Sequence, residues 1–150
     1  MFLGCKKLTT FDVDLSSLTN AYSMFYNCTA LTTFSSDLPK LMDGTDMFKD
    51  CFNLSSFNSD LSSLTNAYSM FYNCIALASF SSDLPKLMDG TNMFYNCKEL
   101  STFTSDLSSL TSGRGMFYEC IALTSFTSDL SSLTDGEYMF CYCELNKESV

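Results

Sequence analysis

Met70-Phe71-Tyr72-Asn73-Cys74 is the stretch that decides the fold, because the chain repeats it at a constant interval. A Met-Phe pair recurs every 23 residues without insertion or deletion, and a cysteine follows three residues behind each Phe. Constant periods of about 20–50 residues are the signature of solenoids and related repeat proteins. The seven Met-Phe pairs begin at residues 1, 24, 47, 70, 93, 116 and 139.

Numbered from its Met, the unit has positions 1 to 23, with six full copies over residues 1–138 and a partial copy over 139–150. Position 8 is Leu in every full copy, position 11 is Phe, and positions 15 and 18 are Leu. One unit alone buries too few apolar side chains to offset the entropy lost on ordering its backbone. Units must therefore stack, and residues at one position should form a file, one above the other in successive coils.

Positions 8–13, such as Leu-Thr-Thr-Phe-Ser-Ser, are rich in the residues that favour strands. Met-Phe-x-x-Cys places positions 1, 2 and 5 on one side of a helical turn, which predicts that Met, Phe and Cys are buried and that positions 3 and 4 face outward. We expect a single right-handed β-solenoid over residues 1–150, with short parallel strands and short helical turns. The polar segment 146–150 is expected to cap its C-terminal end, whereas the first coil has no such cap.

Composition excludes several classes of function. The 150-residue chain has a net charge of −9, which argues against nucleic-acid binding. It contains no His, the commonest general base, and we find no nucleophile–base pair or phosphate-binding loop, so we expect neither enzymatic activity nor a cofactor. No apolar run is long enough for membrane insertion. No signal peptide is expected, because Met1 already lies in the repeat register.

The cysteine and aspartate files could carry chemistry. Neighbouring cysteines about 4.8 Å apart would be within reach of disulfide pairing, but seven thiols cannot all pair, and the file fits a small buried side chain. Cys141 lies outside it, so a terminal disulfide or a reactive thiol stays open. The Asp residues at position 14, from Asp14 to Asp129, could bind calcium, or could accept amide hydrogens of the following turn. We expect the structural role and no metal site.

Two files are candidate contact residues for a partner. Tyrosines at position 3 are predicted to point outward and would offer a large contact area; alternatively, their rings only lean over neighbouring coils. Hydroxyl side chains at position 10 belong to a Ser/Thr-rich strand face, which could equally be a solvated surface. These candidates are Tyr26, Tyr72, Tyr95, Tyr118, Thr33, Ser56, Ser79, Thr102 and Ser125.

The repeat resembles the BspA-like leucine-rich repeats, including the related 23-residue form found in mycoplasma surface lipoproteins. The matching features are the Met-Phe-Tyr-Asn-Cys block, the Leu-x-x-Phe strand three residues behind the Cys, and the Leu-Thr-Asp or Leu-Thr-Asn turn before the next Met-Phe, over residues 1–143. The sequence departs from the family at position 13, which is Ser in five copies and Val13 in the first, where an aliphatic residue is usual. The resemblance implies a leucine-rich-repeat solenoid at the cell surface, with adhesion and partner binding as its function.

Two functions follow as hypotheses. The first is a non-enzymatic binding or adhesion module whose partner is a protein or a cell-surface glycan, contacted through the strand face and the Tyr residues. The second is a structural or self-assembling spacer, in a virion or a surface layer, that associates end to end through its uncapped ends.

Overall fold

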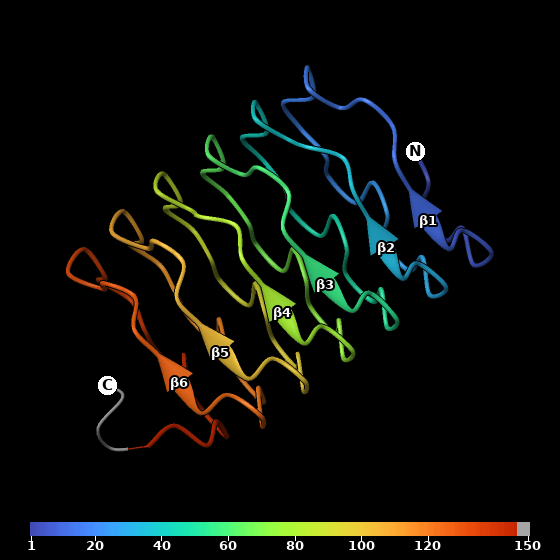
Figure 1. Cartoon of the computed structure of the whole chain (residues 1–150). Coiled ribbons are helices and arrows are strands. Elements are labelled where there is room, and N and C mark those ends of the chain that lie inside the picture. The colour runs from blue at the N-terminus through green and yellow to red at the C-terminus, as the bar shows by residue number, and fades with distance from the viewer. Residues whose placement is uncertain (147–150) are drawn as a thin grey trace.

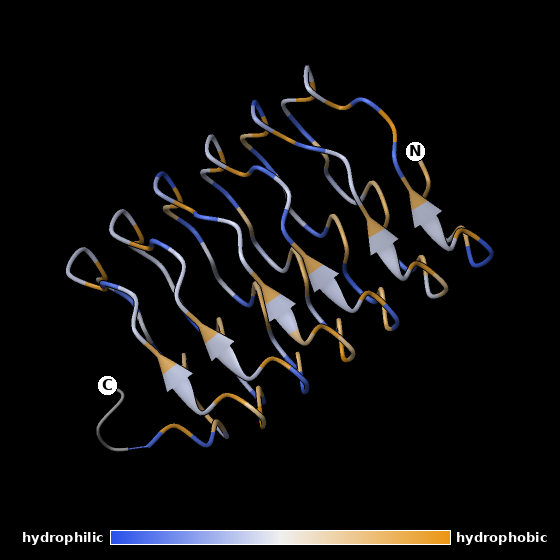
Figure 2. Ribbon diagram, in the orientation of Figure 1, coloured by the Kyte–Doolittle hydropathy of each residue, from blue (hydrophilic) through white to orange (hydrophobic). Residues whose placement is uncertain are grey.

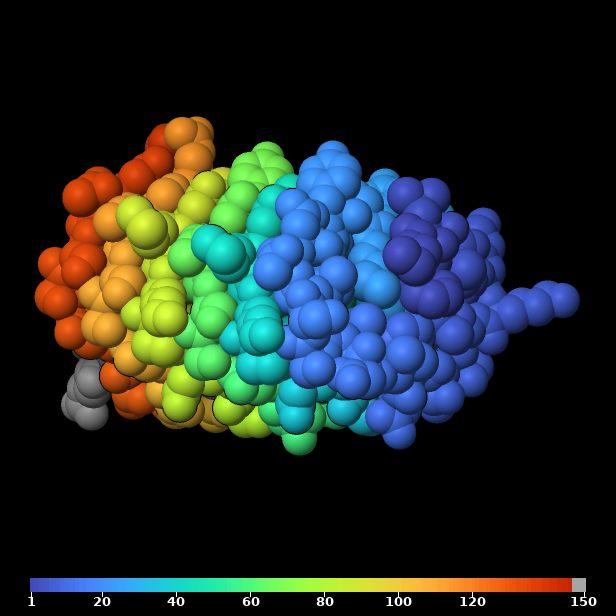
Figure 3. Space-filling model, turned by 90° about the horizontal axis from the view of Figure 1, so that it is seen from above, coloured from blue at the N-terminus to red at the C-terminus, as the bar shows by residue number. Residues whose placement is uncertain are grey.

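The structure is a computed structural model that describes residues 1–146. The chain winds as a regular solenoid in which the strands lie side by side in one row (Figure 1). Coils 1 to 6 comprise residues 1–23, 24–46, 47–69, 70–92, 93–115 and 116–138, and they follow one another along the long axis (Figure 3). Their strands are β1 Thr10–Phe11, β2 Thr33–Phe34, β3 Ser56–Phe57, β4 Ser79–Phe80, β5 Thr102–Phe103 and β6 Ser125–Phe126.

Successive coils are held in register by parallel backbone pairing. β1 pairs with β2, β3 with β4 and β5 with β6, and Thr10 lies opposite Thr33, an offset of one full repeat. A second row of parallel bridges runs through position 20, beginning with Asn20 opposite Asp43. The prediction that equivalent residues stack in files is therefore confirmed. The predicted strand over positions 8–13 shortens to two residues, positions 10 and 11.

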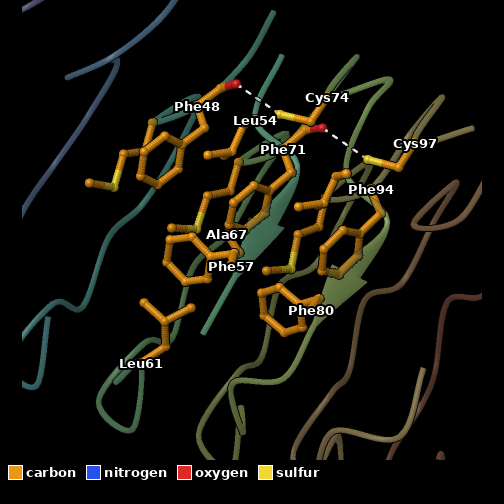
Figure 4. Packing of buried hydrophobic residues seen from close by; sticks show 14 of the residues in the cluster. Phe48, Leu54, Phe57, Leu61, Ala67, Phe71, Cys74, Phe80, Phe94 and Cys97 are labelled. Carbon is orange, nitrogen blue, oxygen red and sulfur yellow. Dashed lines mark hydrogen bonds between the residues drawn. The ribbon is translucent and has the colours of Figure 1, made fainter. Parts of the chain in front are cut away.

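The core consists of the predicted apolar files. Phe residues at position 2 stack on one another with ring centroids 5.3–5.6 Å apart, and those at position 11 stack at 5.7–5.8 Å. The two files meet edge to face, the arrangement that the ring quadrupole favours (Figure 4). Each strand consequently pairs a polar residue with a buried Phe (Figure 2). Met, Leu and Cys of the repeat complete the core between these rings.

The short helical turns expected in Met-Phe-x-x-Cys are not formed in residues 1–146, and this part of the prediction is wrong. The segment is a series of tight turns, in which the amides of Tyr26 and Cys28 donate to carbonyls three residues back. The amide between them, on Asn27, donates to the carbonyl of Lys49 in the next coil at 2.8 Å, and the amide of Phe25 donates to that of Met47 at 2.9 Å. A helix would need every amide for its own backbone, and here alternate amides join the coils.

Left-handed backbone at two positions also breaks any helix. Positions 23 and 4 have positive φ throughout, as in Asp46 at 54° and Asn73 at 60°. Asn, Asp and Gly tolerate this conformation best, and they occupy most of these sites. The glycines at position 21, by contrast, do not need it, in agreement with the Ala found there in two copies.

The serines at position 13 are buried, although hydroxyls there replace the aliphatic residue of the resembling repeats. Ser36, Ser59, Ser82 and Ser105 are each at most 5% exposed. Ser82 donates to the carbonyl of Ser59 at 2.6 Å, and the amide of Val13 donates to the hydroxyl of Ser36. The hydroxyls of Ser36 and Ser82 therefore add contacts between coils, whereas the buried hydroxyls of Ser59 and Ser128 have no hydrogen-bond partner among the described residues.

None of the residues that the structure describes forms a helix long and apolar enough to cross a membrane. Of the predicted polar cap, residues 147–150 lie outside the described part of the chain.

Candidate binding surface

The strand face carries one hydroxyl side chain per coil at position 10. The adjacent Phe at position 11 points into the core, so position 10 must face solvent. Thr33, Ser56, Ser79 and Thr102 are exposed, and Ser125 is half-buried. Within the described chain, these five hydroxyls take part in no hydrogen bond.

Threonines at the preceding position 9 behave differently. The hydroxyl of Thr32 donates to the carbonyl of Thr9 at 3.0 Å, and that of Thr124 donates to the carbonyl of Ser101 at 3.4 Å. These hydroxyls are committed to the contact between coils. Two hydroxyls at position 9 are therefore used between coils, whereas those of position 10 are not, a distinction that composition alone does not reveal.

The tyrosines at position 3 form a stack. Tyr72, Tyr95 and Tyr118 follow one another with ring centroids 4.6 Å apart and planes inclined by 10°, and Tyr142 closes the stack edge-on against Tyr118. All three stacked rings are half-buried. The faces of these rings pack against one another, so only the ring edges and the hydroxyls could contact a partner.

Tyr26 is separated from this stack by Lys49, which occupies position 3 of the third coil. The Lys49 ammonium lies 5.9 Å from the ring centre of Tyr26 and 5.1 Å from that of Tyr72, within cation–π distance of both. Asp46 holds the same ammonium at 3.6 Å. The predicted row of tyrosines is therefore one file interrupted by a cation.

The hydroxyls of Tyr95 and Tyr118 stay protonated at neutral pH. Desolvation by the packed rings and the neighbouring Tyr142 and Tyr95 raise the pKa of Tyr118 to about 12. Desolvation, followed by the neighbouring Tyr72, raises the pKa of Tyr95. The file therefore presents neutral groups that can donate and accept hydrogen bonds.

Between the Tyr file and the strand face, the chain turns a corner at positions 6 and 7. Phe52, Ile75 and Ile121, all at position 6, are 37%, 40% and 49% exposed. A shallow hollow of about 300 Å³ lies between the corners of neighbouring coils, lined by Phe52, Ile75 and Lys98 among others. Sequence reasoning missed these apolar residues, because position 6 varies between copies and shows no repeat pattern.

The Asp residues at position 14 have the structural role that we expected. Asp14 accepts the amide hydrogen of Ser16 at 2.9 Å, and Asp60 that of Ser62 at 2.9 Å; these hydrogen bonds lower the pKa of both carboxyls. In coil 2, Pro39 replaces the donor, and Asp37 accepts the amide of Asp60 in the next coil instead. Among the described residues, no three acidic or thiol side chains gather as a metal site.

The cysteines at position 5 are buried thiols that also bond between coils. Cys74 donates to the carbonyl oxygen of Phe48 at 3.1 Å, and Cys97 to that of Phe71 at 3.2 Å (Figure 4). Burial raises the pKa of Cys51 to about 12 and holds that of Cys74 well above its usual value. All eight cysteines are free, and both Cys141 and Cys143 are half-buried. The predicted small buried side chain is confirmed, with a directed hydrogen bond that the prediction lacked.

Parallel two-residue strands at an offset of one repeat, enclosing files of Leu and Phe, define a solenoid of the leucine-rich-repeat type. A family model described as BspA type leucine-rich repeat region matches residues 1–78 and 44–147, in six copies. The chain therefore belongs to the BspA type leucine-rich repeat family.

One solved structure supports this fold, and a second was compared. A leucine-rich repeat protein from Bacteroides ovatus aligns with a TM-score of 0.59 at 22% identity, over 86% of this chain and 33% of that one. An internalin from Listeria monocytogenes aligns with a TM-score of 0.47 at 17% identity, over 97% of this chain and 51% of that one. This chain thus spans about a third and about half of their lengths. No curated protein sequence matches it.

Proposed function

We propose that this chain is a non-enzymatic binding module with an adhesive role, whose partner is a protein or a cell-surface glycan. Family membership supports the general class, because leucine-rich repeats are protein-interaction modules. The particular surface is argued from this chain's own residues. It comprises the free hydroxyls of position 10 and the edges of the position 3 tyrosines.

The observation that carries the proposal is the row of exposed hydroxyls at position 10 that take part in no hydrogen bond within the described chain. The hydroxyls of Thr32 and Thr124 donate to the neighbouring coil, whereas those of Thr33 and Ser56 are equally accessible and take part in no hydrogen bond in the described chain. Evenly spaced free hydroxyls can pair with backbone amides and carbonyls of a protein or with the hydroxyls of a glycan. The exposed Phe52 and Ile75 of the adjoining corner add apolar area next to them.

The test is a binding screen of the whole chain against extracellular matrix proteins and a glycan array, followed by variants on the partner found. Ser79→Lys with Thr102→Lys places two bulky cations on the free hydroxyl row and should weaken binding at least tenfold. Tyr72→Phe with Tyr95→Phe removes two hydroxyls but keeps the ring stack, so it tests the Tyr contact without loss of packing.

The matched control is Ser16→Lys with Ser62→Lys, which makes the same change at exposed positions in the turn beyond the strand. It should bind like the unmodified chain. Equal binding by the control and by both test variants would reject this surface. The alternative of a spacer that associates end to end stays a prediction.

A further inference from the structure

A second surface lies on the chain segment that follows the strand and the turn, at positions 17, 19 and 22. We call it the alternating face, because large and small side chains alternate along each file over coils 1 to 4. Position 17 carries Ser17, Lys40, Ser63, Lys86, Ser109 and Ser132. Position 19 carries Thr19, Met42, Thr65, Met88, Thr111 and Thr134. Position 22 carries Tyr22, Thr45, Tyr68, Thr91, Arg114 and Glu137.

The alternation gives this face a strong relief. Met42 and Met88 are each 53% exposed, whereas Thr65 between them is half-buried. A hollow of about 330 Å³ lies at the third coil, lined by Ser63 and Thr65 and flanked by Lys and Met of neighbouring coils. In the view from above, cyan atoms of coil 2 and yellow atoms of coil 4 lie on either side of the green atoms of coil 3 (Figure 3).

The protruding side chains have no function within the described chain. Met42 and Met88 lie outside the core, and Lys40 and Lys86 form no ion pair with any described residue. Tyr22 and Tyr68, on the adjoining file, are 63% and 42% exposed. Exposed apolar side chains gathered on one face and bordered by polar ones mark an interaction surface.

We propose that the occupant of this face is a second copy of the chain, packed face to face and antiparallel. The two-fold axis lies in the plane of the contact, perpendicular to the long axis, between coils 3 and 4. Coil 1 then faces coil 6 of the partner copy, coil 2 faces coil 5, and coil 3 faces coil 4. This axis overlaps all six coils, a length of about 29 Å at about 4.8 Å per coil.

This symmetry places large residues opposite small ones in the four central coils, because it pairs coil 3 with coil 4 and coil 2 with coil 5. Met88 of one copy enters the hollow at Thr65 of the other, and Met42 faces Thr111. At position 17, Lys86 faces Ser63, and at position 22, Tyr68 faces Thr91. Shape complementarity of this kind is what a specific interface requires.

Charge is also compatible with the two-fold contact, even though the chain has a net charge of −9. At position 20, the symmetry sets Asp89 opposite Asn66, and Asp43 opposite Ser112. No carboxylate of this file faces another carboxylate, which would be unfavourable. The interface is narrow, so we expect a reversible dimer that forms at high concentration.

The first test measures the mass of the chain by sedimentation equilibrium from about 10 μM to about 1 mM. The mass should rise with concentration from 16.8 kDa towards twice that value. Thr65→Lys should abolish the rise, because it fills the hollow that receives Met88. A constant mass of 16.8 kDa throughout would overturn the proposal.

The matched control is Thr134→Lys, in the same file. Thr65 and Thr134 each donate a hydroxyl hydrogen bond to the preceding coil, to Met42 and Thr111, so both variants lose the same bond. Thr134 faces Thr19 across the axis, where two small side chains leave room. The control should dimerise like the unmodified chain, and equal loss in both variants would overturn the proposed symmetry.

A second test avoids the Thr65→Lys variant, so its result does not depend on whether that variant folds. Met42→Cys with Thr111→Cys should give a covalent dimer under mild oxidation, whereas each single variant should not. Within one chain these two positions are three coils apart, too far for a disulfide. No covalent dimer in the double variant would overturn the proposal. Neither test touches the strand face, so the proposed binding function can fail or succeed independently.

Discussion

At the scale of the single residue, position 4 shows how one side chain meets two demands. Asn73 adopts a left-handed backbone conformation at φ 60°. Its side-chain amide nitrogen donates a hydrogen bond to the carboxylate of Asp50 at 2.8 Å. Asn96 repeats this arrangement by donating to Asn73 at 2.8 Å. The row ends there, because coil 6 has Glu119, which offers no donor. The buried Oδ1 of Asn96 accordingly accepts no hydrogen bond from the described residues.

Glu119→Asn should stabilise the chain by about 1 kcal/mol, since it supplies the missing donor and suits the left-handed conformation better than Glu. The free energy of unfolding in urea measures the effect. Glu119→Gln is the control, because it removes the same charge but lacks the short side chain that tolerates positive φ. Equal stability of Glu119→Asn and the unmodified chain would contradict this explanation.

At the scale of the structural element, the file of buried cysteines gives the fold a specific response to alkaline pH. Cys51, Cys74 and Cys97 are fully buried, and burial raises the pKa of each thiol, to about 12 for Cys51. In the unfolded chain these thiols lose their protons near pH 9, while the folded chain keeps them. The unfolded state then binds fewer protons, and stability must fall as pH rises.

We therefore expect the free energy of unfolding to be constant from about pH 7 to about pH 8 and to fall between about pH 9 and pH 12. Each fully buried thiol contributes a loss of up to about 1.4 kcal/mol per pH unit. Urea titrations at pH 8, 9, 10 and 11 measure the slope.

Cys51→Ala is the control for this slope. It should be less stable at pH 8, because it leaves a cavity, yet it should lose less stability between pH 8 and pH 11. An unchanged slope in this variant would show that other groups cause the alkaline loss.

At the scale of the whole molecule, the strict 23-residue period makes the coils exchangeable units. Deletion of residues 47–92 removes two whole coils and joins Asp46 to Met93 in register. This variant should still unfold cooperatively, with a lower melting temperature, because stability in such arrays is roughly the sum of contacts between neighbours. Circular dichroism during heating measures the transition.

Deletion of residues 47–58 is the control, since it removes far less of the chain but leaves half a coil. No strand of that coil can then align with its neighbours, and we expect this variant to lose the cooperative transition. A higher melting temperature for the half-coil deletion would contradict the view that coils are the units of stability.

The sequence by itself determined the stacking of coils, the buried files and the role of Asp at position 14. Exact repetition carries this information, because a residue found once per coil must occupy the same environment each time. For this reason Phe71, Cys74 and Leu77 could be placed in the core without coordinates.

Only the tertiary structure decided how the polar groups are used. Whether an amide such as that of Phe25 bonds within its coil or to the next depends on distances between coils, which no local pattern encodes. The same holds for Thr32 and Thr33, which are the same residue type. The hydroxyl of Thr32 finds an acceptor in the preceding coil, and the hydroxyl of Thr33 does not. It holds too for Tyr95, whose ring is covered by its neighbours only after the coils have stacked.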